Sequence, residues 1–176
     1  MKRLGTEHIT AGPRRLRAAI VLCVQIPYLR GMSPPSRPLL EVVQPPHFAR
    51  PRGYANGIIT RGPLLHVAGQ VGWEANGSFA SAEFAPQFAR ALDNVLDVVR
   101  AAGARPEHVA RMTVYVTSVA EYKGALPALG EIWKSRFGKH YPAMALVCVA
   151  GLVEDGALVE IEAVAALPDD AAPGTA

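Results

Sequence analysis

The hydrophobic pattern from residue 53 onward switches between the period of a strand and the period of a helix. Alternating or short continuous apolar runs predict strands, and apolar residues recurring every three or four positions predict helices. The predicted strands cover 63–71, 109–117, 143–150 and 157–166, and the predicted helices cover 83–102 and 121–137. Asn76-Gly77 is a hairpin signal after the first strand, so the order begins with two or three strands. This order predicts an α+β domain with two helices on one face of a mixed sheet.

Each predicted helix has one apolar face that should pack on the sheet. In the first helix this face comprises Phe84, Phe88, Ala91, Val95, Val98 and Ala102. In the second helix it comprises Leu126, Leu129, Ile132, Trp133 and Phe137. Ser81 is a candidate cap for the start of the first helix, and Gly103 stands where a C-terminal cap belongs.

The last predicted strand carries two acids in an otherwise apolar run, A-L-V-E-I-E-A-V-A-A-L at 157–167. Side chains two positions apart share a face of a strand, so Glu160 and Glu162 point the same way as Leu158 and Val164. A buried carboxylate without a partner is costly, so these acids need water, a partner or a function. The two closing strands are apolar on both faces. We therefore expect the sheet face without helices to be covered in an oligomer.

Charge divides the chain into a basic head and an acidic domain. Residues 1–52 hold nine of the 18 Lys and Arg residues but only two of the 15 Asp and Glu residues, a net charge of +7 that leaves −4 for the rest. An acidic domain argues against nucleic acid as a partner, because phosphate binding depends on clustered Lys and Arg. The length of 176 residues suits one domain.

The basic head is rich in proline and should have little fixed structure before about residue 50. It is either a disordered extension or translated sequence upstream of a true start at Met32. A signal or transit peptide is the third alternative, although the apolar patch at 18–24 is short and soon interrupted. The expected organisation is an extension over 1–49, a domain over 50–168 and a short tail over 169–176.

The sequence offers no metal site, cofactor motif or membrane span. Cys23 and Cys148 are far apart and fit neither a disulfide framework nor a zinc site, which favours a cytoplasmic protein. We expect Cys148 to be an inert buried thiol and His66 to be a core histidine. No P-loop, G-x-G-x-x-G or G-x-S-x-G motif is present, and no apolar run is long enough to cross a membrane. We therefore expect no metal, no cofactor and no membrane or nucleic-acid partner.

Seven short motifs occur in a defined order along the domain. They are G-Y-A-N-G at 53–57, V-A-G-Q at 67–70, Q-F-A-R-A-L-D-N-V at 87–95, A-A-G-A at 101–104, M-T-V-Y-V-T at 112–117, Y-P-A at 141–143 and L-V-E-I-E-A-V-A at 158–165. Together they resemble the RidA/YjgF (L-PSP) family of enamine and imine deaminases. The resemblance implies a chorismate-mutase-like fold, a homotrimer and a ligand pocket in each cleft between neighbours. It also implies cofactor-independent hydrolysis of a small molecule such as 2-aminoacrylate to a ketoacid and ammonia.

The resemblance assigns roles to four residues, and Trp73 is a further candidate. Glu160 matches the glutamate that handles the attacking water, although the position also suits a solvated edge-strand acid. Tyr54 matches a cleft tyrosine, and Gly69-Gln70 match a Gly-Gln pair in the cleft. Tyr54 suits interface packing equally well. Trp73 is a candidate wall of the cleft, with ordinary burial as the alternative.

Three polar positions of the family pattern are apolar here. Met144 replaces the arginine that clamps the substrate carboxylate, Ala68 replaces a serine, and Leu126 lies about where an asparagine is common. Methionine offers no donor to a carboxylate but suits an apolar or longer ligand, or simply fills the core. The resemblance thus implies a hydrolytic deaminase for a larger, aminomuconate-type enamine or imine. The alternative is a non-catalytic trimer that binds small molecules or acts as a chaperone.

Overall fold

The computed structural model describes residues 37–169 and 171, so the predictions for Cys23 and for residues 1–36 lie outside the described part of the chain. The strands are β1 (Leu40–Val43), β2 (Gly57–Thr60), β3 (Leu64–Val71), β4 (Val109–Val116), β5 (Ala143–Cys148) and β6 (Val159–Ala166). The helices are α1 (Phe84–Ala101) and α2 (Val119–Phe137), with a short 3-10 turn at Pro106–His108. The predicted helices and the four long strands are confirmed, with ends that differ by a few residues.

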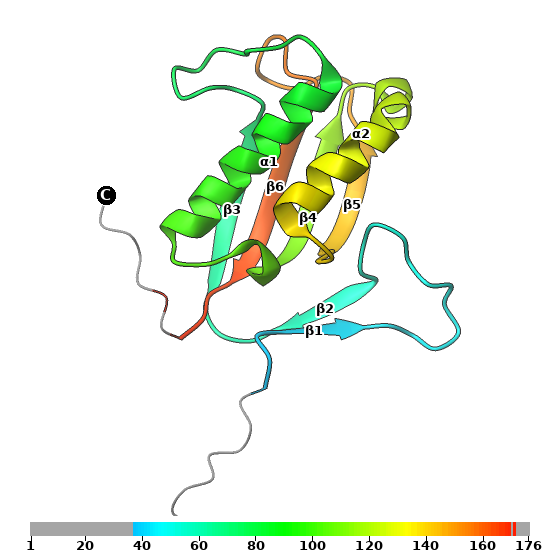
Figure 1. The fold of residues 1–176 in the computed structure, drawn as a ribbon, viewed down its shortest axis with the longest axis vertical. Coiled ribbons are helices and arrows are strands. Elements are labelled where there is room, and N and C mark those ends of the chain that lie inside the picture. Colours follow the sequence, from blue (N-terminus) through cyan, green and yellow to red (C-terminus); the bar gives the residue numbers. More distant parts are fainter. Residues whose placement is uncertain (1–36, 170, 172–176) are drawn as a thin grey trace, which may run out of the picture. The chain divides into compact units, whose positions relative to one another are not determined.

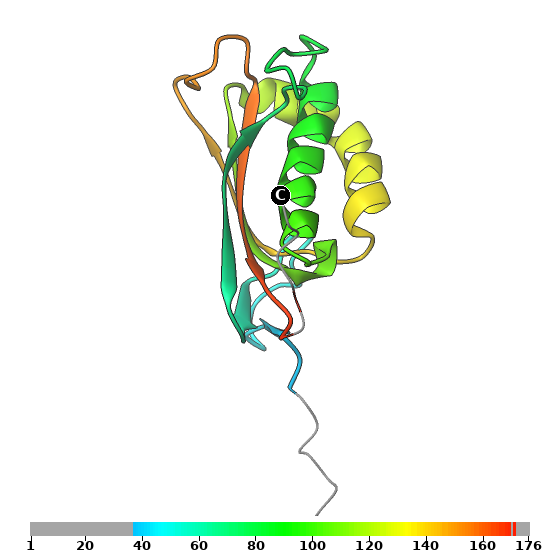
Figure 2. The same cartoon turned by 90° about the vertical axis from the view of Figure 1, so that its left-hand side faces the viewer.

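A four-stranded mixed sheet is the centre of this part of the chain. Its order is β3-β6-β4-β5, with β4 and β5 parallel and the other neighbours antiparallel. Both helices lie on the same face of the sheet, so the described residues place no helix on the other face, which is called the uncovered face below (Figure 1, Figure 2). This is the α+β fold expected from the sequence and from the resemblance.

Ordered structure begins earlier than expected. β1 pairs with β2 as an antiparallel ribbon, from Leu40 opposite Thr60 to Val43 opposite Gly57. The expectation of little fixed structure before about residue 50 is therefore wrong for this segment. The four-residue strand is short and mostly exposed, and prolines stand on both sides of it, so the sequence shows no clear strand pattern.

Each helix packs on the sheet through most of the predicted face. The long side chains Phe88, Leu92 and Val95 of α1 are buried, and Leu129, Trp133 and Phe137 of α2 are buried with them in one core. Two predictions are corrected, because Val98 is 36% exposed and Leu126 is 47% exposed. Both lie at the margins of their helical faces, where a small change of helix orientation decides between sheet and solvent.

The ends of α1 differ in how well they were predicted. Gly103 ends the helix as expected, with a φ of 75° and with its N–H donating to the carbonyl of Arg100. Ser81 does not cap the helix itself. Its hydroxyl accepts a hydrogen bond from the N–H of Glu83, which is the N-cap residue.

Gln87 joins the start of α1 to the start of β6, a contact that the hydrophobic pattern does not predict. The side chain is 1% exposed. Its amide nitrogen donates to the carbonyls of Ser81 and Gly156, at 3.0 and 2.9 Å, and its oxygen accepts from the N–H of Leu158 at 2.9 Å. A buried polar group is stable when its bonds are satisfied, and this one fixes where β6 enters the sheet.

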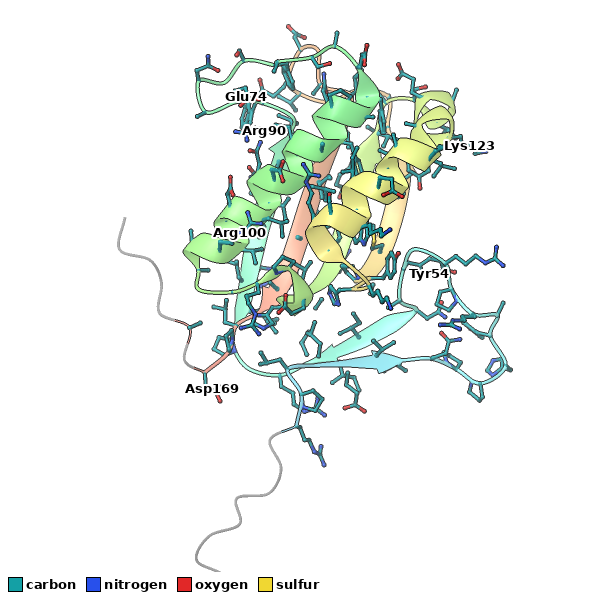
Figure 3. The ribbon with its side chains drawn as sticks, in the orientation of Figure 1. Tyr54, Glu74, Arg90, Arg100, Lys123 and Asp169 are labelled. Atoms are coloured by element: carbon teal, nitrogen blue, oxygen red, sulfur yellow. The ribbon has the colours of Figure 1, made fainter. Side chains whose placement is uncertain are left out.

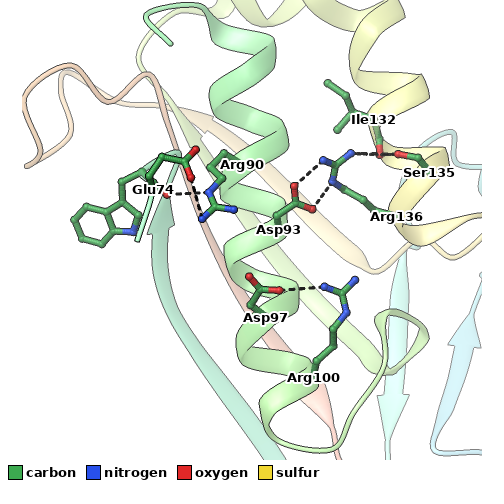
Figure 4. A network of polar contacts seen from close by, with 9 residues as sticks. Glu74, Arg90, Asp93, Asp97, Arg100, Ile132, Ser135 and Arg136 are labelled. Atoms are coloured by element: carbon green, nitrogen blue, oxygen red, sulfur yellow. Dashed lines mark hydrogen bonds and ion pairs between the residues drawn. The ribbon is translucent and has the colours of Figure 1, made fainter. Parts of the chain in front are cut away.

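An ion pair holds the two helices together. Both nitrogens of the Arg136 fork on α2 donate to the carboxylate of Asp93 on α1, each at 2.7 Å (Figure 4). Hydrogen bonding to Asp93 is the main reason why the pKa of Arg136 is raised above its ordinary value. The parallel fork geometry makes this pair more specific than a single surface contact.

We expect Gln87→Leu to lower the free energy of unfolding by about 3 kcal/mol, because two carbonyls and one N–H lose their buried partner. Gln44→Leu is the control, since Gln44 is exposed and water can replace its bonds. Its expected cost is below about 1 kcal/mol. Urea unfolding at equal protein concentrations compares the two variants, and equal costs would contradict the structural role of Gln87.

Candidate functional site

The two acids of β6 point away from the helices. Ile161 and Ala163 are buried under the helices, whereas Glu160, Glu162 and Val164 are partly exposed on the other face. The alternation predicted from the sequence is confirmed. Both carboxylates therefore lie on the uncovered face of the sheet, within reach of anything that binds there.

Glu160 lies against the backbone of β3 at Gly69, which has no side chain. A Cβ built on Gly69 would be 2.7 Å from the carboxyl carbon of Glu160 and in hard contact with one carboxylate oxygen. The register between β3 and β6 shifts between Val67 and Gln70, so the segment Ala68-Gly69 leaves the regular ladder here. This arrangement places exposed backbone of β3 beside a carboxylate.

Ala68 and Gly69 are exposed, and Gln70 is partly buried beside them. The side-chain nitrogen of Gln70 donates to the carbonyls of Ala68 and Gly69, each at 3.2 Å. The structure thus brings together four of the predicted site residues: Glu160, Ala68, Gly69 and Gln70. This group is called the carboxylate side below.

A second feature of the uncovered face is a hollow of about 390 Å³ next to the carboxylate side. Its polar lining residues are His66, Arg111, Thr113 and Glu162. Thr113 is 6% exposed and its hydroxyl has no hydrogen-bond partner among the described residues. Desolvation and then the negative charge of Glu162 raise the pKa of the neighbouring Tyr115 phenol above its ordinary value.

Met144, which was predicted to line the site, lies in a different hollow of about 200 Å³ under α2. It is lined by Gly53, Phe88, Val114, Tyr122, Leu126, Leu129, Gly130, Trp133, Tyr141, Met144 and Leu146. We call it the apolar hollow. Met144 is partly buried and Leu126 is exposed at its margin, so Met144 lines a cavity as well as contacting the core.

Tyr54 is held near the apolar hollow by its neighbours in the chain. The N–H of Ala55 donates to the carbonyl of Pro142 at 2.8 Å, and Ala55 forms a parallel bridge with Ala143. Gly53 is itself a lining residue. The tyrosine is 43% exposed in the loop that precedes β2 (Figure 3).

Trp73 lies in a third place, in the loop that joins β3 to α1. The expected hairpin is reduced to a tight turn, with Gly77 at a φ of 79° and a single antiparallel bridge from Trp73 to Phe79. The carbonyl of Trp73 accepts from Arg90 and Asn94 on α1, and Arg90 also pairs with Glu74 (Figure 4). The ring is partly exposed rather than fully buried.

The chain does not bring Met144 and Glu160 to one site. Met144 pairs in register with Met112 of β4, and Glu160 pairs with Tyr115 of β4 from the other side. The two residues are thus on strands separated by a third, about 10 Å apart at the strand spacing alone. They also point to opposite faces. A ligand that contacts both needs a second copy of the chain.

Two further predictions are corrected by the structure. His66 is exposed on the uncovered face, and Cys148 is an exposed free thiol at the end of the edge strand β5. Both predictions were based on apolar neighbours in sequence. They are wrong because β3 and β5 are the two outer strands of the sheet. Sequence reasoning also missed Tyr122 and Tyr141 as lining residues. Their spacing from Trp133 shows a shared cavity only once α2 is docked.

Within residues 37–169 and 171, no group of three or more His, Cys, Asp and Glu side chains is placed to hold a metal ion. In the same part of the chain, no helix has the length and apolar character needed to cross a membrane.

The chain belongs to the RidA/YjgF (L-PSP) family. The family model described as Endoribonuclease L-PSP matches residues 47–167, and relatives and solved structures of RidA/YjgF proteins agree with it. The human protein named 2-iminobutanoate/2-iminopropanoate deaminase is 31% identical over 102 residues, which cover 57% of this chain and 71% of the relative. The Escherichia coli protein named putative reactive intermediate deaminase TdcF is 30% identical over 115 residues, covering 64% and 84%.

Solved structures show the same fold. A Rid-family protein of unknown function from Yersinia pestis superposes with a TM-score of 0.65 at 32% identity, over 73% of this chain and 99% of that one. The YjgF protein of E. coli superposes with a TM-score of 0.54 at 28% identity, over 64% and 87%. The resemblance seen in the motifs is therefore confirmed at the level of family and fold.

We expect alanine to be tolerated at Gly69 but not at Gly72. At Gly69 the new methyl group meets the end of the Glu160 side chain, which can rotate away at a cost below about 1 kcal/mol. At Gly72 it would lie 2.6 Å from the backbone oxygen of Gln87, which cannot move without moving α1. The expected cost there is above about 2 kcal/mol. Urea unfolding of the two variants tests this, and a Gly69→Ala protein as unstable as Gly72→Ala would place the carboxylate elsewhere.

Proposed function

We propose that this protein is a cofactor-independent deaminase that hydrolyses an enamine or imine in clefts between the copies of a homotrimer. The observation that carries the proposal is the carboxylate side, where Glu160 lies against the open backbone of Gly69. Relatives named as imine and reactive-intermediate deaminases support the reaction class. Glu160 supplies the acid and base, and no metal is needed for the reaction.

The chemistry requires one group that first accepts a proton and later returns it. Glu160 accepts a proton from water as the water oxygen attacks the carbon of the C=N bond. The proton is then delivered to the nitrogen of the tetrahedral intermediate. Glu160 then moves the hydroxyl proton of this intermediate to the nitrogen in the same way. The C–N bond breaks, its electron pair leaves with ammonia, and a carbonyl compound remains. An enamine enters the same route after tautomerising to the imine.

Assembly into a trimer is supported by the surfaces that the chain leaves uncovered. Leu146 and Val147 on the edge strand β5 are 36% and 43% exposed, and an apolar edge invites a partner. On the uncovered face, Arg111 and Glu162 form no ion pair with any described residue, and the buried Thr113 hydroxyl lacks a partner. A second copy that packs on this face brings its own arginine and glutamate, so charges of opposite sign can pair across the interface. Such a copy also brings an apolar hollow to the carboxylate side.

The replacement of the arginine clamp by Met144 favours a substrate larger than 2-aminoacrylate. An aminomuconate-type compound is the candidate suggested by the resemblance, and the substrate itself stays a prediction. The cytoplasmic location also stays a prediction.

A second function remains in view because the clamp is missing. The same trimer could bind a small molecule, or protect other proteins, without hydrolysis. Met144 and the exposed Leu126 favour this alternative, since neither side chain can hold a carboxylate for chemistry.

We expect the purified protein to release ammonia from at least one larger compound, either an aminomuconate or the 2-imino acid of leucine, and only slowly from freshly generated 2-aminoacrylate. Glu160→Gln should lower kcat at least about a hundredfold, because proton transfer by a positioned group typically contributes that much. Glu162→Gln is the matched control, since it changes the same residue type two positions along the same face. It should retain most of the activity.

Coupled measurement of ammonia for the three proteins decides between the functions. Activity that survives Glu160→Gln would contradict its role as acid and base. No release from any of these compounds by a folded oligomer would favour the binding function.

A further inference from the structure

The apolar hollow has a chemistry that bears on the substrate itself. None of its eleven lining residues carries a charge. The only polar side-chain atoms that could face a ligand are the hydroxyls of Tyr122 and Tyr141 and the indole nitrogen of Trp133. The indole N–H is already engaged, since it donates to the carbonyl of His140 at 3.0 Å.

Aromatic rings form a rigid wall of this hollow. The rings of Trp133 and Phe137 stack with centroids 4.4 Å apart, and the rings of Trp133 and Tyr141 are parallel within 3° at 5.8 Å. Trp133 is 7% exposed, so its ring is fixed by packing rather than free to turn. A fixed aromatic wall offers dispersion contact to a flat or branched apolar group.

The volume suits one side chain. A hollow of about 200 Å³ corresponds to roughly seven water molecules at about 30 Å³ each, which is comparable to a leucine or phenylalanine side chain with some clearance. Leu126 and Leu146 are partly exposed at its margin, so a ligand can enter without unfolding α2.

The free energy of burial in this hollow differs between an apolar and a charged group. Burying a leucine- or phenylalanine-sized group is favourable, because its apolar surface leaves water. A carboxylate placed here would lose its water without gaining a cation, which is unfavourable. The difference corresponds to at least about tenfold in affinity.

We infer that the group entering the apolar hollow is the uncharged, apolar side chain of the substrate, branched aliphatic or aromatic, attached to the carbon of the C=N bond. Within the proposed class of enamines and imines, this favours compounds derived from apolar amino acids over aminomuconates, which carry a carboxylate at each end. The identity of the reacting group rests on the proposed function. The preference of the hollow does not, because it concerns binding alone.

Calorimetric titration of the full-length protein with the corresponding 2-oxo acids, which are the reaction products, tests the inference. The probes are 4-methyl-2-oxopentanoate with a branched apolar side chain, pyruvate with a methyl group, and 2-oxoglutarate with a charged side chain. We expect the branched compound to bind at least about tenfold more tightly than pyruvate, and 2-oxoglutarate to bind most weakly.

Two exposed leucines provide a matched pair of variants. Leu126→Asn changes the margin of the hollow, and Leu64→Asn changes a leucine of nearly equal exposure on β3, at 47% and 45% respectively. Only Leu126→Asn should weaken binding of the branched compound. Met144→Arg should reverse the preference, because it adds a cation that pairs with the charged side chain.

Equal or tighter binding of pyruvate or 2-oxoglutarate by the unaltered protein would overturn the inference, as would equal effects of the two leucine variants or no binding at all. The proposed function fails in a different way. Tight binding of the branched compound, with no ammonia released from any imine, would remove the deaminase and leave the apolar preference. Glu160-dependent ammonia release without that preference would support the deaminase and contradict the apolar preference.

Discussion

The packing of α1 and α2 on a single face of the four-stranded sheet decides which side chains are buried and which are left for partners. It buries Leu92, Leu96 and Val99 of α1 completely against the alternate residues of the strands. Because strand side chains alternate, each residue that does not face the helices is committed to the other face. Glu160, Glu162 and Arg111 are exposed to partners for this reason. The polar contacts of Gln87 fix α1 to the start of β6, and the Asp93–Arg136 pair fixes the two helices to each other.

The same constraint separates the two halves of the candidate site. The carboxylate side belongs to the uncovered face at β3 and β6, whereas the apolar hollow lies between the sheet and α2 near the edge strand β5. One chain supplies both halves but cannot join them around one ligand. Assembly is therefore part of the chemistry in the proposed function, in which Met144 in place of an arginine would change one half and leave the other intact.

Sequence patterns predicted those parts of the fold that depend on local periodicity. The alternation around Glu160 and the repeat of α1 from Phe84 to Val95 were sufficient to place both elements and their buried faces. Features set by tertiary contacts could not be predicted. Gln87 can be buried because it bonds to the carbonyls of Ser81, in the preceding loop, and of Gly156, which is far away in sequence. His66 is exposed because β3 is an outer strand of the sheet. The apolar hollow needs Trp133 and Met144 from elements that only docking brings together.

In the proposed deaminase, each active cleft takes Glu160 from one copy and the apolar hollow from another. This arrangement can be tested by mixing two inactive variants: Glu160→Gln, which lacks the carboxylate, and Leu126→Arg, which blocks the hollow from an exposed position on α2. After the two proteins are unfolded, combined in equal amounts and refolded, we expect recovery of roughly a quarter of the unaltered ammonia-release rate, since random assembly joins two intact halves in that share of clefts. A mixture no more active than its separate parts would show that the site lies within one chain.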